Sequence, residues 1–61
     1  MNNQHDERIL RLQEVVNRTG IARSTIYYKI ERGCFPAQLR LGPKMVGWYK
    51  SEIDAWIANP R

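Results

Sequence analysis

The chain has few of the residues that build disulfides, metal sites and membrane spans. Its 61 residues include one cysteine, Cys34, and one histidine, His5. These two cannot form an internal disulfide or complete a metal cluster, so we expect a reduced, intracellular protein without a metal or other cofactor. No apolar run approaches the roughly 20 residues of a membrane span, and the first residues lack a signal-peptide core. We therefore expect no contact with a membrane.

The small size of the chain also argues against an enzyme. Its 61 residues allow one small domain, which buries only about 60% of the surface of its unfolded chain and has no room for a roofed catalytic cleft. The sequence has no second histidine, no Cys–His pair close in sequence and no phosphate-binding glycine loop. We predict that the protein is not an enzyme.

Positive charge is abundant, and its distribution is uneven. The formal net charge is +4, which favours a polyanionic partner. Between positions 18 and 32 Glu31 is the only acidic residue, and the basic residues there are Arg18, Arg23, Lys29 and Arg32. The remaining acidic residues lie in other segments. This distribution points to binding of nucleic acid.

Two helices separated by a short turn are predicted over residues 12–19 and 23–33. In the first, apolar residues recur at i, i+3 and i+4, and Gly20 can adopt the positive φ that ends a helix. In the second, Ile26 and Ile30 stack on one face, and the polar and basic residues occupy the other sides. A helix, a glycine turn and a second helix form the helix-turn-helix arrangement.

A β-hairpin is predicted after the second helix. Residues 37–41 alternate apolar and polar side chains, as a half-buried strand does, and residues 42–44 have the composition of a turn. Residues 45–49 then return as a second strand. Arg40 and Lys44 lie near the outer side or tip of this hairpin, which we interpret as a wing.

A last helix is predicted over residues 50–58. Its core-facing residues are Ile53, Trp56 and Ile57. Ser51 and Asp54 at its start have the spacing of a capping box. The whole pattern predicts a small α+β winged helix-turn-helix domain over residues 9–61, which begins with a short extended lead-in and follows a disordered tail at residues 1–8.

Two tryptophans in this pattern have alternative interpretations. Trp48 and Trp56 could act as stacking platforms for single-stranded nucleic acid. In so small a domain we assign both to the core instead, because of their size and spacing.

Several local motifs resemble those of one family of regulators. They are Arg11-Leu12-Gln13-Glu14-Val15, Thr19-Gly20-Ile21, Arg23-Ser24-Thr25-Ile26-Tyr27, Phe35-Pro36 and Trp48-Tyr49-Lys50-Ser51-Glu52-Ile53-Asp54-Ala55-Trp56. Together with the order of the elements, they resemble the MerR-superfamily winged helices, and more closely the AlpA-like prophage transcriptional regulators and related small excisionases. The resemblance covers residues 9–57. It implies a bacterial cytoplasmic, nucleoid-associated protein whose partner is double-stranded DNA.

Two positions depart from the family pattern. Ala22 stands where a small hydroxyl residue usually precedes the second helix, and a poor cap there costs about 1 kcal/mol. Arg11 stands where a capping hydroxyl is common, and its side chain has no acceptor. Both departures weaken helix starts, while the candidate DNA-facing residues match the family.

The second helix, at about residues 23–32, carries most of the candidate DNA-binding residues. Arg23, Ser24 and Thr25 occupy its first turn, the part that enters the major groove in such motifs, although the hydroxyls could instead cap their own helix. Tyr28 is expected to be exposed and to contact DNA. Tyr27 lies beside the apolar face, and we expect its hydroxyl to reach a phosphate.

Further basic residues extend this candidate site. Lys29 and Arg32 are expected to contact backbone phosphates, which contributes affinity and salt dependence rather than sequence preference. Arg40 and Lys44 on the wing are candidates for contact with the flanking DNA, although hairpin tips also carry charges for solubility alone.

Three functions are compatible with this pattern. The first is a sequence-specific transcriptional regulator of a prophage or mobile element, and the second is an excisionase that bends DNA. The third, of a different class, is a winged-helix adaptor whose exposed face around Tyr28 binds an acidic protein. One module buries only about 600–1,000 Å² on DNA, so we expect copies of the chain to bind cooperatively.

Overall fold

Three helices and a three-stranded antiparallel sheet make up residues 7–60, the part of the chain that the computed structural model describes. The elements follow the order β1 (Ile9–Arg11), α1 (Leu12–Thr19), α2 (Arg23–Glu31), β2 (Leu39–Gly42), β3 (Met45–Tyr49) and α3 (Lys50–Ala58). Within this part no helix is long and apolar enough to cross a membrane.

The turn between α1 and α2 depends on a glycine in the left-handed region. Gly20 has a φ of 73°, and its backbone N–H donates a hydrogen bond to the carbonyl of Val16 at 2.8 Å. This geometry ends α1 at the predicted residue, because glycine has no Cβ to oppose a positive φ. The second helix begins at Arg23, as predicted, but its last helical residue is Glu31, slightly before the predicted end at residue 33.

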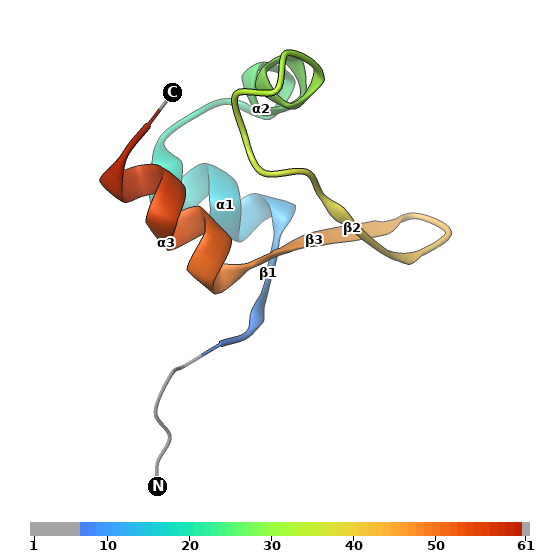
Figure 1. Cartoon of the computed structure of the whole chain (residues 1–61). Helices are drawn as coiled ribbons and strands as arrows, with labels where there is room; N and C mark the ends of the chain where they lie inside the picture. Colours follow the sequence, from blue (N-terminus) through green and yellow to red (C-terminus); the bar gives the residue numbers. More distant parts are fainter. Residues whose placement is uncertain (1–6, 61) are drawn as a thin grey trace, which may run out of the picture.

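The sheet has one strand more than the predicted hairpin. β3 is the central strand, and β1 and β2 pair with it on either side. The residues predicted only as an extended lead-in form β1, in which Leu10 lies opposite Trp48. β2 starts at Leu39, opposite Gly47, rather than at residue 37. Figure 1 shows the β2–β3 hairpin projecting away from α1 and α3, in the manner of a wing.

The core lies where the three helices meet the inner face of the sheet. Its buried residues are Leu10, Val15, Ile26, Phe35, Trp48, Ile53 and Trp56. Both tryptophans therefore belong to the core, as predicted, and each indole N–H reaches the segment after α2. Trp48 Nε1 donates to the carbonyl of Pro36 at 2.9 Å, and Trp56 Nε1 donates to that of Cys34 at 2.8 Å. These bonds fix the end of α2 to the rest of the domain.

The start of α3 differs from the prediction. Ser51 lies inside the helix rather than at its N-cap, which is Tyr49, so the predicted capping box with Asp54 does not form. The carboxylate of Glu7 instead accepts hydrogen bonds from the backbone N–H of Ser51 at 3.0 Å and from its hydroxyl at 2.8 Å. A carboxylate there satisfies first-turn donors that a local cap would otherwise bind.

Two further expectations concern the ends of the chain. The backbone N–H of Lys50 donates to the carbonyl of Arg8, so Glu7 and Arg8 both contact the start of α3. The rest of the tail predicted at residues 1–8 lies outside the described residues. In α3, the prediction of Ile57 as a core residue is wrong, since its side chain is 40% exposed.

Candidate nucleic-acid interface

Helix α2 is anchored through one side and exposes the others. Ile26 is completely buried, and Ile30 packs against the core. The first-turn residues Arg23, Ser24 and Thr25 are exposed, as the predicted contacts with DNA require. The N-cap residue Ala22 provides no side-chain hydrogen bond, so the first N–H groups of the helix have no side-chain cap there.

The predicted contact residues on α2 do not all share one face. Tyr28 is 57% exposed, and the guanidinium of Arg32 lies over its ring at 5.4 Å from the centroid. Lys29 instead lies on the side of α2 that faces α3, with its Nζ 5.9 Å from the centroid of a Trp56 ring. Arg23 and Tyr27 face the hairpin, where they line a cavity with Lys44.

This cavity, which we call the interface cavity, lies between the start of α1, the start of α2 and the hairpin. Its volume is about 410 Å³, and its lining residues are Arg11, Leu12, Gln13, Arg23, Tyr27, Lys44 and Val46. An adjoining hollow of about 380 Å³ shares Leu12, Gln13 and Arg23 with it. The fold thus brings the predicted residues Arg23 and Tyr27 of α2 together with the distant Lys44, and adds Arg11 and Gln13, which were not predicted.

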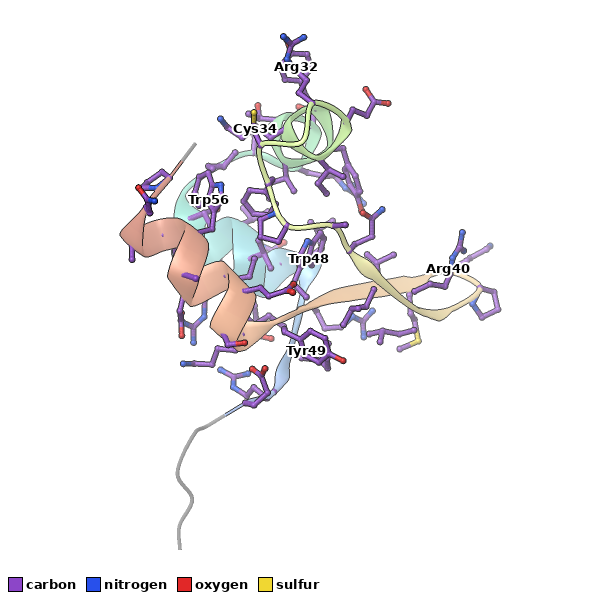
Figure 2. The ribbon with its side chains drawn as sticks, viewed as in Figure 1. Arg32, Cys34, Arg40, Trp48, Tyr49 and Trp56 are labelled. Carbon is purple, nitrogen blue, oxygen red and sulfur yellow. The ribbon has the colours of Figure 1, made fainter. Side chains whose placement is uncertain are left out.

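Arg40 lies on the arm of the hairpin. It pairs with Val46 across the two strands, so both side chains emerge on the same sheet face, the one that faces the interface cavity. Its Nη1 donates a hydrogen bond of 3.4 Å to the carbonyl of Pro43 in the turn. Figure 2 shows Arg40 on the side of the hairpin toward α2, and Tyr49 on the opposite side.

Some of the basic side chains form ion pairs with carboxylates of the same domain. Arg8 pairs with Glu14 at 3.1 Å, and both Lys50 and Arg18 pair with Asp54, at 2.8 and 3.5 Å. The hydrogen bond from Arg8, with one from the backbone of Arg11, lowers the pKa of Glu14 below its ordinary value. The hydrogen bond from Lys50 likewise lowers the pKa of Asp54. These two carboxylates are therefore ionised and already paired with basic side chains of the domain.

The remaining cations gather on α2, the hairpin and the end of β1. Within residues 7–60 no carboxylate forms an ion pair with Arg11, Arg23, Arg32, Arg40 or Lys44. Their charge is therefore available to an external anion. Over the same residues, no group of His, Cys, Asp and Glu side chains could hold a metal ion.

Comparison with known proteins finds a matching family and similar relatives. The family described as prophage CP4-57 regulatory protein (AlpA) matches residues 8–61. The chain is 44% identical to the DNA-binding transcriptional activator AlpA of Escherichia coli (strain K12), over 97% of the chain and 93% of that protein. It is 52% identical to the uncharacterized protein ORF88 of Enterobacteria phage P4, over 87% of the chain but 60% of that protein, so it spans less than two thirds of the phage relative. No solved structure matches the chain.

Proposed function

We propose that this chain, which belongs to the AlpA family of prophage regulatory proteins, is a sequence-specific double-stranded DNA-binding regulator of transcription. The relative from Escherichia coli, described as a DNA-binding transcriptional activator, supports this class of function. The observation that carries the proposal is the distribution of charge. Arg8, Arg18 and Lys50 are paired with carboxylates, whereas within residues 7–60 no carboxylate forms an ion pair with Arg23, Arg32, Arg40 or Lys44. The family is described as regulatory, so no enzymatic activity is proposed.

The proposed binding mode is that of a winged helix-turn-helix. Helix α2 lies in the major groove, where Arg23, Ser24 and Thr25 of its first turn reach base edges or phosphates. This assignment is supported by the exposure of all three side chains. The hairpin then lies on the flanking DNA as a wing and brings Arg40 and Lys44 to the backbone.

The other side chains of α2 have different proposed roles. Tyr28 and Arg32 form one exposed unit on the outward face, which suits contact with bases or sugars at the groove edge. Tyr27, at the interface cavity, places its hydroxyl toward the backbone. Lys29 is assigned to a phosphate at the edge of the interface, since it lies over Trp56 and away from the hairpin.

The size of the domain suggests that several copies act together. One such module buries about 600–1,000 Å² on DNA, which limits the specificity of a single copy. We therefore propose cooperative binding of copies of the chain at adjacent sites on bacterial DNA in the cytoplasm. An excisionase that bends DNA is the alternative, because it uses the same groove helix and wing. Footprinting separates the two: phased sites at an attachment site favour excision, and one site beside a promoter favours regulation.

Selection of bound sequences from a random duplex pool tests the proposal. We expect the wild-type chain to enrich a short motif, and the spacing of repeated motifs to give the arrangement of copies. A matched selection with the Arg23→Ala variant is expected to lose the motif, because that side chain lies in the first turn of α2. The absence of any enriched motif or duplex binding at low salt would contradict the proposal and leave the protein-binding adaptor in its place.

A further inference from the structure

We propose that the interface cavity binds one phosphate group of the DNA backbone, with Arg11 and Gln13 as contacts in addition to the groove helix and the wing. This inference rests on the proposed function and extends it. The ligand is a phosphodiester, recognised by charge and by hydrogen-bond donors rather than by sequence. The geometry assigns to this cavity the strand of DNA that passes between α2 and the hairpin.

Three cations from three different elements line the cavity. Arg11 ends β1, Arg23 begins α2, and Lys44 lies in the turn of the hairpin. No carboxylate lines the cavity, and none forms an ion pair with these three side chains within the described range. Like charges that converge on one concave surface raise its positive potential and attract an anion. A phosphate in the cavity would lower their mutual repulsion.

The nearest acidic residue to Arg11 in sequence is already engaged. Glu14 accepts a hydrogen bond of 3.1 Å from Arg8 through Oε2, and its Oε1 accepts one of 3.3 Å from the backbone N–H of Arg11. The carboxylate therefore holds the backbone of Arg11 in place, but it forms its ion pair with Arg8 and not with the guanidinium of Arg11. The guanidinium of Arg11 retains its planar set of donors, which suits a phosphate.

Gln13 adds a neutral donor to the same surface. Its Nε2 donates a hydrogen bond of 3.1 Å to Oδ1 of Asn17, one turn along α1. This contact uses one of the two amide hydrogens and orients the side chain, so the second hydrogen can donate to a phosphate oxygen. Tyr27 also lines the cavity, and its hydroxyl is a further potential donor.

The position of the cavity agrees with the path of the DNA. If α2 lies in the major groove and the hairpin on the flanking DNA, the backbone between those two regions must cross the space between them. The interface cavity occupies that space, because Arg23 and Tyr27 of α2 and Lys44 of the hairpin all line it. A phosphate held there would set the angle between helix and wing on the duplex.

The salt dependence of duplex binding tests this assignment. Removal of one phosphate contact lowers the slope of log affinity against log salt by about 1. We expect this decrease for Arg11→Gln, with an unchanged sequence preference, and a retained slope for Arg11→Lys, which keeps the charge. Arg8→Gln removes the same charge outside the cavity, so its slope should stay close to that of the wild type. Equal slopes for Arg11→Gln and Arg8→Gln would overturn the inference.

A duplex with single uncharged methylphosphonate linkages locates the phosphate. At one linkage we expect neutralisation to weaken wild-type binding by about tenfold and to weaken Arg11→Gln by less, because one charged contact of that phosphate is already absent from the variant. Additive losses at every linkage would overturn the inference. Failure of the wild type to bind any duplex would instead contradict the proposed function, so the two failures are distinguishable.

Inorganic phosphate distinguishes a DNA contact from a site for free phosphate. Calorimetric titration of the DNA-free wild type with inorganic phosphate at constant ionic strength should show no saturable binding, because the cavity holds a phosphodiester only as part of the duplex interface. Saturable binding that Arg11→Gln abolishes would show a site for free phosphate and would overturn the assignment to the DNA backbone.

Discussion

Trp48 and Pro36 are joined by a hydrogen bond of 2.9 Å from the indole Nε1 to the backbone carbonyl. Trp48 lies in the central strand of the sheet and is completely buried, while Pro36 belongs to the segment that leaves α2. This bond ties the segment after α2 to β3, the central strand, which is also one strand of the hairpin. The relative position of the two proposed DNA-binding elements therefore depends on a core residue that touches no DNA.

Trp48→Phe should lower the free energy of unfolding by about 2–3 kcal/mol. The shorter side chain leaves space in the core, and the carbonyl of Pro36 loses its donor. Urea denaturation measures the change, with Tyr49→Phe as the control. Tyr49 is 41% exposed, so that variant should differ from the wild type by less than about 0.5 kcal/mol. Equal stabilities for the two variants would contradict the role of the Trp48 bond.

Gly47→Ala should destabilise the sheet by about 1–3 kcal/mol. A Cβ at this position would clash with Cγ2 of Ile9 and come within 2.9 Å of Cδ1 of Leu41 and 3.1 Å of the Leu10 carbonyl. The β1 backbone cannot move away without losing its pairing with β3.

Gly42→Ala is the matched control for this substitution. The three atoms nearest to its added Cβ all belong to Met45 and lie at 3.7 Å or more, which is ordinary contact. The control should therefore keep or slightly raise stability, by up to about 1 kcal/mol. Thermal denaturation of both variants checks the pair, and a tolerated Gly47→Ala would contradict the close packing of β1 against β3.

Stability should fall as the pH is lowered through the acidic range. The pKa of Glu14 is lowered from its ordinary 4.5 chiefly by the hydrogen bond from Arg8, and that of Asp54 from its ordinary 3.8 chiefly by the one from Lys50. The unfolded chain therefore binds more protons in this range. The contribution of each carboxylate is present above its ordinary pKa and is lost as the pH falls through the lowered, folded-state pKa.

Glu14→Gln and Asp54→Asn should each flatten this pH dependence. The pH range over which stability changes less than in the wild type should begin at higher pH for Glu14→Gln than for Asp54→Asn. The reason is that the ordinary pKa of Glu14 is the higher of the two. Urea denaturation at a series of pH values provides the test. Identical profiles for the wild type and both variants would show that neither carboxylate contributes.

Tyr28→Ala should weaken binding to a selected duplex by about tenfold while leaving the fold intact. The side chain is 57% exposed and supports the guanidinium of Arg32, so its loss removes a contact and disorders a second. Tyr49→Ala serves as the control, since Tyr49 is also exposed but lies on the side of the sheet that faces away from α2 (Figure 2). Equal effects of the two variants would contradict a role for Tyr28 in the interface.

Local patterns were sufficient to predict the helices. The apolar stripe that begins at Leu12 predicts the start of α1, and the positive φ available to Gly20 predicts its end. Helix α3 also has its predicted bounds. Contacts between distant segments were not predictable in the same way. β1 has three residues and pairs with a strand far along the chain, and Glu7 contacts Ser51 across 44 positions.

In the candidate site, too, local features were predictable from the sequence and contacts between distant segments were not. The exposure of Ser24 and Thr25 follows from the burial of Ile26, because the helical period places them on other sides of α2. Arg11 was interpreted only as a poor helix cap, because no local pattern places the end of β1 beside α2 and the hairpin. The position of Lys29 over Trp56 likewise depends on how α3 packs, which the sequence of α2 does not encode.

The central claim is that α2 binds duplex DNA through its first turn, and a salt-dependent binding titration tests it most directly. Fluorescence anisotropy with a selected duplex should show a steep loss of affinity as salt rises. Arg23→Ala should bind at least about tenfold more weakly at low salt, with unchanged stability, because Arg23 is exposed and no carboxylate pairs with it among residues 7–60. Arg18→Ala, which removes an arginine paired with Asp54, should bind nearly as well as the wild type. No duplex binding at low salt, or equal binding by the wild type and Arg23→Ala, would contradict the claim.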